Sequence, residues 1–132
     1  MLNSRGKNLT VLVDSWAWIE YFKGSEAGKK AKQIIESGQQ ILVSTINIGE
    51  VYLFLLRHDQ KQADHFIQFM LQTSFIIPLE TTTALNAATL KNKLKMGMAD
   101  AIVLASAEDH KADILTGDDD FKNMKNVIYL GR

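Results

Sequence analysis

The sequence predicts an α/β domain in which helices cover both faces of a parallel sheet. Short apolar runs typical of buried strands alternate with longer segments of helical periodicity along nearly the whole chain. Strands separated by helices pair in parallel, because the helix supplies the crossover connection. The 132 residues can bury one hydrophobic core but are too few for two ordinary domains. We therefore expect residues 1–132 to form a single domain, an α/β/α sandwich with four or five strands.

The expected strands are short and rich in Ile, Leu and Val. Continuous apolar runs of this kind indicate strands that are covered on both faces. The single proline of the chain, Pro78, follows the third strand and ends it. In chain order the expected strands are Leu9–Val13, Gln40–Ser44, Phe75–Ile77, Ala112–Thr116 and Asn126–Leu130.

The expected helices fill the segments between these strands. Ser15 is a candidate N-cap for the first of them, and Gly24 a candidate stop. The six helices are Ser15–Phe22, Ser25–Ser37, Thr45–His58, Lys61–Gln72, Thr81–Lys95 and Ala99–His110. In the fifth helix, four apolar residues are expected to face inward: Ala84, Leu85, Ala88 and Leu94.

Four carboxylates lie where a fold normally avoids charge. Asp14 ends the first strand and Asp118 follows the fourth, while Glu50 and Asp100 lie in the first turns of apolar helices. In an open parallel sheet, the carboxyl ends of the strands and the starts of the following helices meet at one edge. The topology therefore allows all four acids to converge.

A hard divalent cation is the simplest way to stabilise such a cluster. Crowded or buried carboxylates repel each other and are costly without cationic partners. No Lys or Arg lies near enough in sequence to pair obviously with Asp14, Glu50 or Asp100. Magnesium binds oxygen ligands and usually takes only one or two carboxylates directly. We expect Asp14 and Asp118 as direct ligands, Asp100 as a further candidate, and Glu50 acting through water.

Each acid taken alone also has an ordinary structural explanation. Asp14 can cap the helix that follows it, and Glu50 gains energy from the macrodipole of its helix. Asp100 can be a helix N-terminal charge, although small and apolar residues surround it. The run from Asp118 to Asp120 can be a polar turn. These explanations account for single acids better than for four acids at one edge.

Composition excludes several other classes of protein. The absence of cysteine excludes disulfides, zinc-thiolate sites and cysteine nucleophiles. Fifteen basic and fifteen acidic residues argue against a charge-driven DNA binder but not against a nucleic-acid enzyme. No apolar run approaches the roughly 20 residues that span a bilayer, and no signal-peptide-like stretch follows residues 1–7, because Asp14 interrupts the apolar run there. We expect a cytoplasmic protein.

Two other functions are compatible with an acidic edge. One is a phosphatase with Asp14 as nucleophile, although a well-placed basic partner near Thr116 is missing. The other is a receiver-like module that binds metal without turnover. A phosphoaspartate on Asp14 would support the first, and metal binding without catalytic turnover the second.

Lysines and aromatic residues near the acids are weaker signals. Lys30 and Lys91 belong to basic groups that could contact phosphates, although solvated helix faces explain them as well. Trp16 and Tyr52 could stack on bases, although packing in a core or dimer is the better explanation for most such residues.

Four segments together resemble the motifs of a known family. They are Val13–Phe22 around Asp14, Ser44–Val51 around Glu50, Met96–Ala105 around Asp100, and Leu115–Phe121 with its Asp-x-Asp-Phe sequence. Their order and spacing are similar to those of the PIN-domain nucleases, especially the small VapC-type toxins. The resemblance covers essentially the entire chain and implies a sheet of order 3-2-1-4-5.

By this resemblance the protein is a Mg²⁺- or Mn²⁺-dependent endoribonuclease that cleaves RNA phosphodiester bonds by metal-activated water. The catalytic and metal-binding acids would be Asp14, Glu50, Asp100 and Asp118. Ser15, Thr116 and Asp120 would be supporting polar residues, whereas Asp119 is expected to face solvent.

The resemblance also implies partners. A VapC-type toxin is neutralised by a small antitoxin protein, which we expect to cover the acids with a basic side chain. We further expect a homodimer, with the apolar helices from Thr45 to Gln72 as the candidate surface. A PIN nuclease that serves in RNA processing rather than as a toxin is the alternative.

Overall fold

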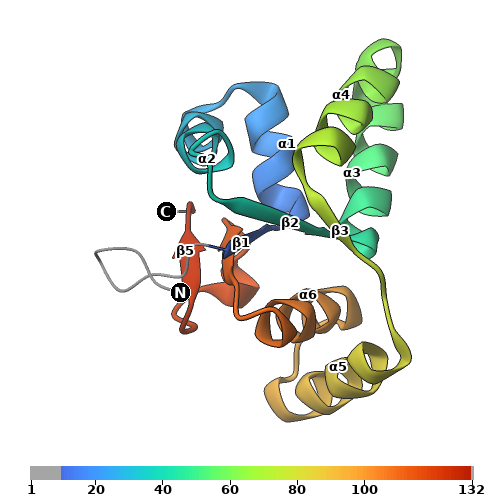
Figure 1. Cartoon of the computed structure of the whole chain (residues 1–132), viewed down its shortest axis with the longest axis vertical. Coiled ribbons are helices and arrows are strands. Elements are labelled where there is room, and N and C mark those ends of the chain that lie inside the picture. The colour runs from blue at the N-terminus through green and yellow to red at the C-terminus, as the bar shows by residue number, and fades with distance from the viewer. Residues whose placement is uncertain (1–9, 132) are drawn as a thin grey trace.

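Five parallel strands form the centre of the structure, a computed structural model that describes residues 10–131. The order β3-β2-β1-β4-β5 is the one expected (Figure 1). In the register of the central strands, Leu12 of β1 pairs with Leu42 of β2 and with Ile114 of β4. The strands are β1 (Thr10–Val13), β2 (Gln40–Ser44), β3 (Phe75–Ile77), β4 (Asp113–Thr116) and β5 (Val127–Tyr129). Leu9, the expected start of β1, and residues 1–7 lie outside the described residues.

Helices cover both faces of the sheet (Figure 1). On one face lie α1 (Ser15–Lys23), α2 (Glu26–Ile35), α3 (Thr45–His58) and α4 (Gln60–Thr73), and on the other α5 (Thr81–Leu94) and α6 (Met98–Asp109). A 3₁₀ turn, η1 (Asp119–Phe121), follows β4. Within residues 10–131, no helix is long and apolar enough to cross a membrane.

Two hydrophobic cores follow from the alternation of side chains along β1. Val11 and Val13 belong to the core under α1 to α4, whereas Leu12 between them belongs to the core under α5 and α6. Successive residues of a strand point to opposite faces, so a strand buried on both faces must be apolar throughout. This burial explains why the strands read as continuous apolar runs.

The short turn between α1 and α2 brings these helices close together. Gly24 adopts φ 70° and its N–H donates to the carbonyls of Glu20 and Tyr21, which ends α1 as expected. The Ser25 hydroxyl then caps α2 by accepting from the Gly28 N–H at 3.0 Å. A Cβ on Gly28 would lie 1.9 Å from the Glu20 carbonyl oxygen, so this contact requires glycine.

The buried face of α5 differs from the expected one. Leu85 is 65% exposed and Leu94 43% exposed, and Ala84 and Ala88 are exposed as well. The buried residues of α5 include Ala87. The helix packs on α6 and not on the sheet (Figure 1). A narrow stripe of small side chains, which includes Thr83 and Ala87, is therefore enough to form this contact. The expectation of inward-facing Ala84, Leu85, Ala88 and Leu94 was wrong for this reason.

Candidate active site

Asp14 lies at the carboxyl end of β1, where its side chain is 5% exposed. Its backbone N–H donates to the Leu115 carbonyl at 3.0 Å, which continues the pairing of β1 with β4. One carboxylate oxygen accepts from the Thr116 hydroxyl at 2.8 Å, and the other from the Asn47 amide at 3.1 Å. The side chain makes no capping bond to α1. Capping therefore does not explain the presence of Asp14.

Thr116 connects Asp14 to the segment after β4. Its hydroxyl donates to Asp14 and accepts from the Asp118 N–H at 3.0 Å. Asp118 in turn accepts from the Asp120 N–H at 2.9 Å and caps η1. One oxygen of Asp118 thus has the role in a polar turn that the sequence suggested. This role does not prevent the carboxylate from also binding a cation.

Asn47 is a site residue that the sequence analysis missed. Its side chain is fully buried, and its amide nitrogen also lies 2.9 Å from the Ser15 hydroxyl and 3.2 Å from a Glu50 carboxylate oxygen. Ser15 donates to the same Glu50 oxygen at 2.6 Å. The available signal was spacing, because Asn47 precedes Glu50 by three residues and so shares its helix face.

Glu50 lies at the outer edge of the group. Its helical neighbours predicted a core-facing surface, but the residue is exposed. That expectation was wrong, because α3 turns only its Asn47, Val51 and Leu55 side inward. The bonds from Ser15 and Asn47 nevertheless turn the carboxylate of Glu50 toward Asp14.

Asp100, Asp118 and Asp120 form the closest carboxylate group among the described residues. One oxygen from each can be chosen so that all lie within 4.8 Å of one another. Asp100 comes from the first turn of α6, and the other two from the turn after β4. Asp119 is exposed, accepts from the Tyr129 hydroxyl and is not in this group. The structure thus brings Asp120, expected only as support, beside Asp100 and Asp118.

Burial and mutual repulsion raise the pKa values of two of these acids. Burial is the main reason that the pKa of Asp14 rises to about 6, and the charges of Glu50 and Asp118 add to the rise. Hydrogen bonds from the Thr116 hydroxyl and from the backbone N–H of Ser15 oppose it. Burial also raises the pKa of Asp100 to about 7, followed by the hydrogen bond with Asp120 and the charge of Asp118. Both groups thus resist ionisation in the absence of a cation.

Within residues 10–131, no basic side chain forms an ion pair with an acid of the cluster. The ion pairs among residues 10–131 are Lys23–Glu20, Lys29–Glu26 and Lys32–Glu36, and none includes a site acid. An all-oxygen donor set without a basic partner fits a hard divalent cation. Asp100, Asp118 and Asp120 are the best-placed ligands. Both oxygens of Asp14 already accept protein hydrogen bonds, so its expected direct ligation is less favoured than that of Asp118.

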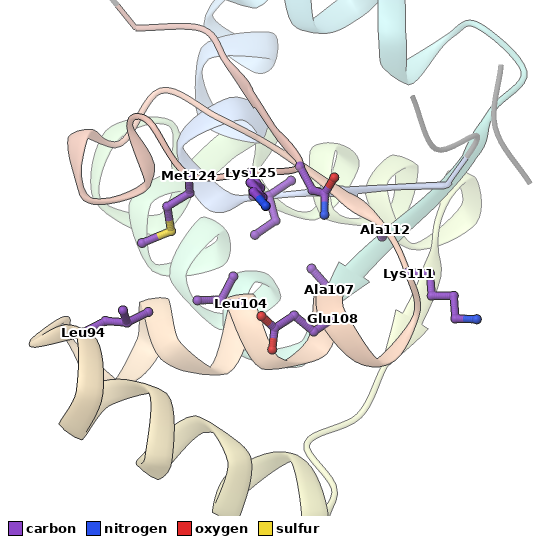
Figure 2. A pocket seen from close by; sticks show the side chains of 10 residues that line it. Leu94, Leu104, Ala107, Glu108, Lys111, Ala112, Met124 and Lys125 are labelled. Carbon is purple, nitrogen blue, oxygen red and sulfur yellow. The ribbon is translucent and has the colours of Figure 1, made fainter. Parts of the chain in front are cut away.

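Two hollows are candidates for a ligand site. One, of about 790 Å³, lies beside the acids and includes Asp118 in its wall. The other, of about 640 Å³, lies between α6 and the segment before β5, with Leu104, Glu108 and Met124 in its wall (Figure 2). None of the site acids lines this second hollow. The first is therefore the one relevant to the acidic edge.

Comparison with known proteins gives a family and similar structures. Residues 11–127 match the model of the PIN domain. A toxin–antitoxin complex from Klebsiella pneumoniae contains a chain that is 28% identical, with a TM-score of 0.76 over 91% of this chain and 97% of that one. No curated protein matches the sequence.

Less similar structures share the fold. Mycobacterium tuberculosis VapC20, described as a toxin that cleaves the sarcin-ricin loop, is 15% identical, with a TM-score of 0.74 over 87% of this chain and 95% of that one. VapBC2 from Rickettsia felis, bound to a promoter DNA fragment, contains a chain with 16% identity and a TM-score of 0.72 over 91% and 96%. The match to the PIN model covers β2, β3 and β4, most of β1, the first residue of β5 and all the site acids. The chain therefore belongs to the PIN domain family.

Proposed function

We propose that this protein is a divalent-metal-dependent endoribonuclease and the toxin of a VapBC-type toxin–antitoxin pair. One observation carries the proposal. Acids from the ends of β1 and β4 and from the starts of α3 and α6 converge on one edge, where the described residues provide no cationic partner. Membership of the PIN family and the named function of VapC20 support the choice of RNA as substrate.

Some of the site residues would bind the metal ion, and others would orient the acids. Asp100, Asp118 and Asp120 would hold Mg²⁺ or Mn²⁺, with Asp14 beside them and Glu50 at the outer edge. A bound ion would stabilise charge on the phosphate and lower the pKa of a water molecule. Thr116 and Asn47 fix the orientation of Asp14, and Ser15 fixes that of Glu50. These bonds hold the acids in place before substrate arrives.

A cleavage assay on mixed cellular RNA, with and without chelator, tests this function. We expect wild-type protein to cut RNA only with Mg²⁺ or Mn²⁺, and Asp100→Asn to lose the activity while keeping its fold. Asp119→Asn is the matched control, because it makes the same chemical change at a neighbouring carboxylate that accepts from Tyr129 and is not in the group. Metal binding without any RNA cleavage would instead favour a binding module, and activity in Asp100→Asn would refute the assignment.

We also propose a small antitoxin as partner. The similar structures from Klebsiella and Rickettsia are toxin–antitoxin complexes, and an exposed acidic edge suits a basic side chain of such a partner. Growth arrest on expression should be relieved by co-expression of the neighbouring open reading frame. Harmless expression of an active enzyme would favour a role in RNA processing.

A homodimer is the proposed assembly. Of the expected surface between Thr45 and Gln72, α4 turns its apolar side to the core, whereas α3 exposes Leu53 and Leu56. Phe75 and Ile76 of the edge strand β3 are exposed as well. Exposed apolar side chains such as these are candidates for a protein–protein interface. In sedimentation experiments, wild-type protein should be a dimer and Leu53→Glu a monomer. A monomeric wild-type protein would rule out the proposed dimer.

A further inference from the structure

The hollow beside the acids is lined by the aromatic residues Trp16 and Tyr129 and by one basic residue, Lys30, which the proposed active site does not use. Its walls come from α1, the start of α2, the turn after β4, and β5. We propose that this hollow binds one nucleotide of single-stranded RNA next to the cleaved bond, with the base against Trp16 and a phosphate at Lys30. The proposal rests on the proposed ribonuclease function and adds the form of RNA that the enzyme accepts.

The position of the hollow links it to the acids. Asp118 and Gly117 are in its wall, so a nucleotide inside it would adjoin the carboxylate group. Its volume of about 790 Å³ lies within the range of about 300–1,000 Å³ that is typical of small-molecule sites. A neighbouring nucleotide of the same strand could therefore reach the acids while the first stays bound.

Trp16 forms a fixed aromatic surface in this wall. The six-membered part of its indole lies against Gly117, where an added Cβ would come within 2.4 Å of the ring. Trp16 is half-buried, whereas Trp18, two residues later, is fully buried in the core. A rigid, partly exposed indole is suited to stacking on any base, because every base has a π-face.

The charges around the hollow leave Lys30 available for a phosphate. Four carboxylates line the hollow. Glu20 pairs with Lys23 and Glu26 with Lys29, whereas Asp118 and Asp119 form no ion pair within residues 10–131. Lys30 is exposed and takes part in none of the ion pairs formed within residues 10–131. It is also the one lysine among the residues that line the hollow. A phosphate at the rim would therefore meet a free cation.

Stacking on Trp16 requires an unpaired base. Bases of a duplex are stacked on their neighbours and paired, so they cannot enter a side pocket without opening the helix. The substrate should thus be single-stranded at the cleaved bond, as in a loop, a bulge or a free end.

Binding of labelled hexauridylate to four variants tests this inference. All carry Asp100→Asn, so that the RNA remains intact in Mg²⁺. We expect Trp16→Ala to weaken binding about tenfold or more and Trp16→Phe to weaken it less. Lys30→Gln should lower the slope of log K against log[salt] by about 0.7, the value for one phosphate contact on a single strand. Lys29→Gln, the same charge change on the neighbouring residue outside the hollow, should leave the slope unchanged.

The outcomes separate this site from the proposed function. Equal salt slopes for Lys30→Gln and Lys29→Gln, together with unchanged binding in Trp16→Phe and Trp16→Ala, would overturn the nucleotide site even if wild-type protein cuts RNA. Equal Trp16 dependence for a short RNA duplex would also overturn it. Conversely, if wild-type protein cuts no RNA but hexauridylate binding depends on Trp16 and Lys30, the site stands and the ribonuclease proposal fails. Quenching of tryptophan fluorescence by hexauridylate, retained in Lys29→Gln and lost in Trp16→Phe, gives a second readout that a purely structural role would not produce.

Discussion

At the scale of single residues, Asn47 shows how buried acids are held in place without a cation from the protein. One amide nitrogen lies within 3.2 Å of oxygens of Asp14, Ser15 and Glu50. A neutral donor satisfies carboxylate oxygens and leaves the negative charge of the group intact. The site thus keeps its attraction for a divalent ion.

Replacing Asn47 should therefore cost stability through unsatisfied acceptors. Asn47→Ala removes the donor from two buried or half-buried oxygens, so we expect a loss of about 1–3 kcal/mol in the free energy of unfolding. Asn86→Ala, an exposed amide on α5, is the matched control and should change stability by less than about 0.5 kcal/mol. Urea unfolding in chelator measures both. Similar values for the two variants would show that Asn47 does not support the acids.

The raised pKa values of Asp14 and Asp100 make stability depend on pH. Both rise from 3.8, to about 6 and about 7, so the folded protein binds protons more tightly than the unfolded chain. Ionisation therefore destabilises the fold above these values, and the penalty is relieved as the pH falls through 7 and 6 toward the unfolded value.

In chelator, the free energy of unfolding should thus increase from about pH 8 to about pH 5. Asp100→Asn should flatten this rise and should exceed wild type in stability at the upper end. Thermal melts across this range provide the measurement. A wild-type free energy of unfolding that decreases from pH 8 to pH 5 would contradict the raised pKa values of Asp14 and Asp100.

At the scale of elements, sequence patterns predicted the existence and type of all the strands and α-helices within residues 10–131, but not the 3₁₀ helix η1. Their limits differ by a few residues, as where Asn126 adopts φ 59° and β5 begins at Val127. Continuous apolar runs identify buried strands because both faces are covered. The inward side of α5 could not be predicted in this way, because its periodicity does not show that α5 packs on another helix rather than on the sheet.

The orientation of α5 can be tested with the same substitution at two sites. Ala87 is fully buried against α6, whereas Ala84 is exposed. Ala87→Leu should overpack the contact and cost about 1–3 kcal/mol, whereas Ala84→Leu should be nearly neutral. Denaturant unfolding compares them. A larger cost at Ala84 would restore the face that the sequence pattern suggested.

The site shows a similar limit. Motif order and topology predicted that Asp14, Glu50, Asp100 and Asp118 would share an edge, because strand ends and helix starts meet there. They could not predict which carboxylate oxygens accept protein hydrogen bonds and which acids lie closest together, because both depend on side-chain contacts between distant segments. Thr116 and Asn47 occupy the oxygens of Asp14, and the turn after β4 brings Asp120 to Asp100.

At the scale of the whole molecule, two hydrophobic cores cover the sheet on its two faces, and the acids gather at its carboxyl edge. Glu50 and Asp100 belong to α3 and α6, which lie on opposite faces of the sheet (Figure 1), whereas Asp14 and Asp118 follow the strands β1 and β4. The hydrogen bonds and raised pKa values at this edge therefore affect the stability of the fold as well as the proposed chemistry.

Calorimetric titration with Mn²⁺ tests the central claim, that acids from distant segments form one cation site. Wild-type protein and Asp119→Asn should bind Mn²⁺ alike, and Asp100→Asn should lose most of the affinity while remaining folded. Equal binding by all three proteins, or no binding by wild type, would contradict the account.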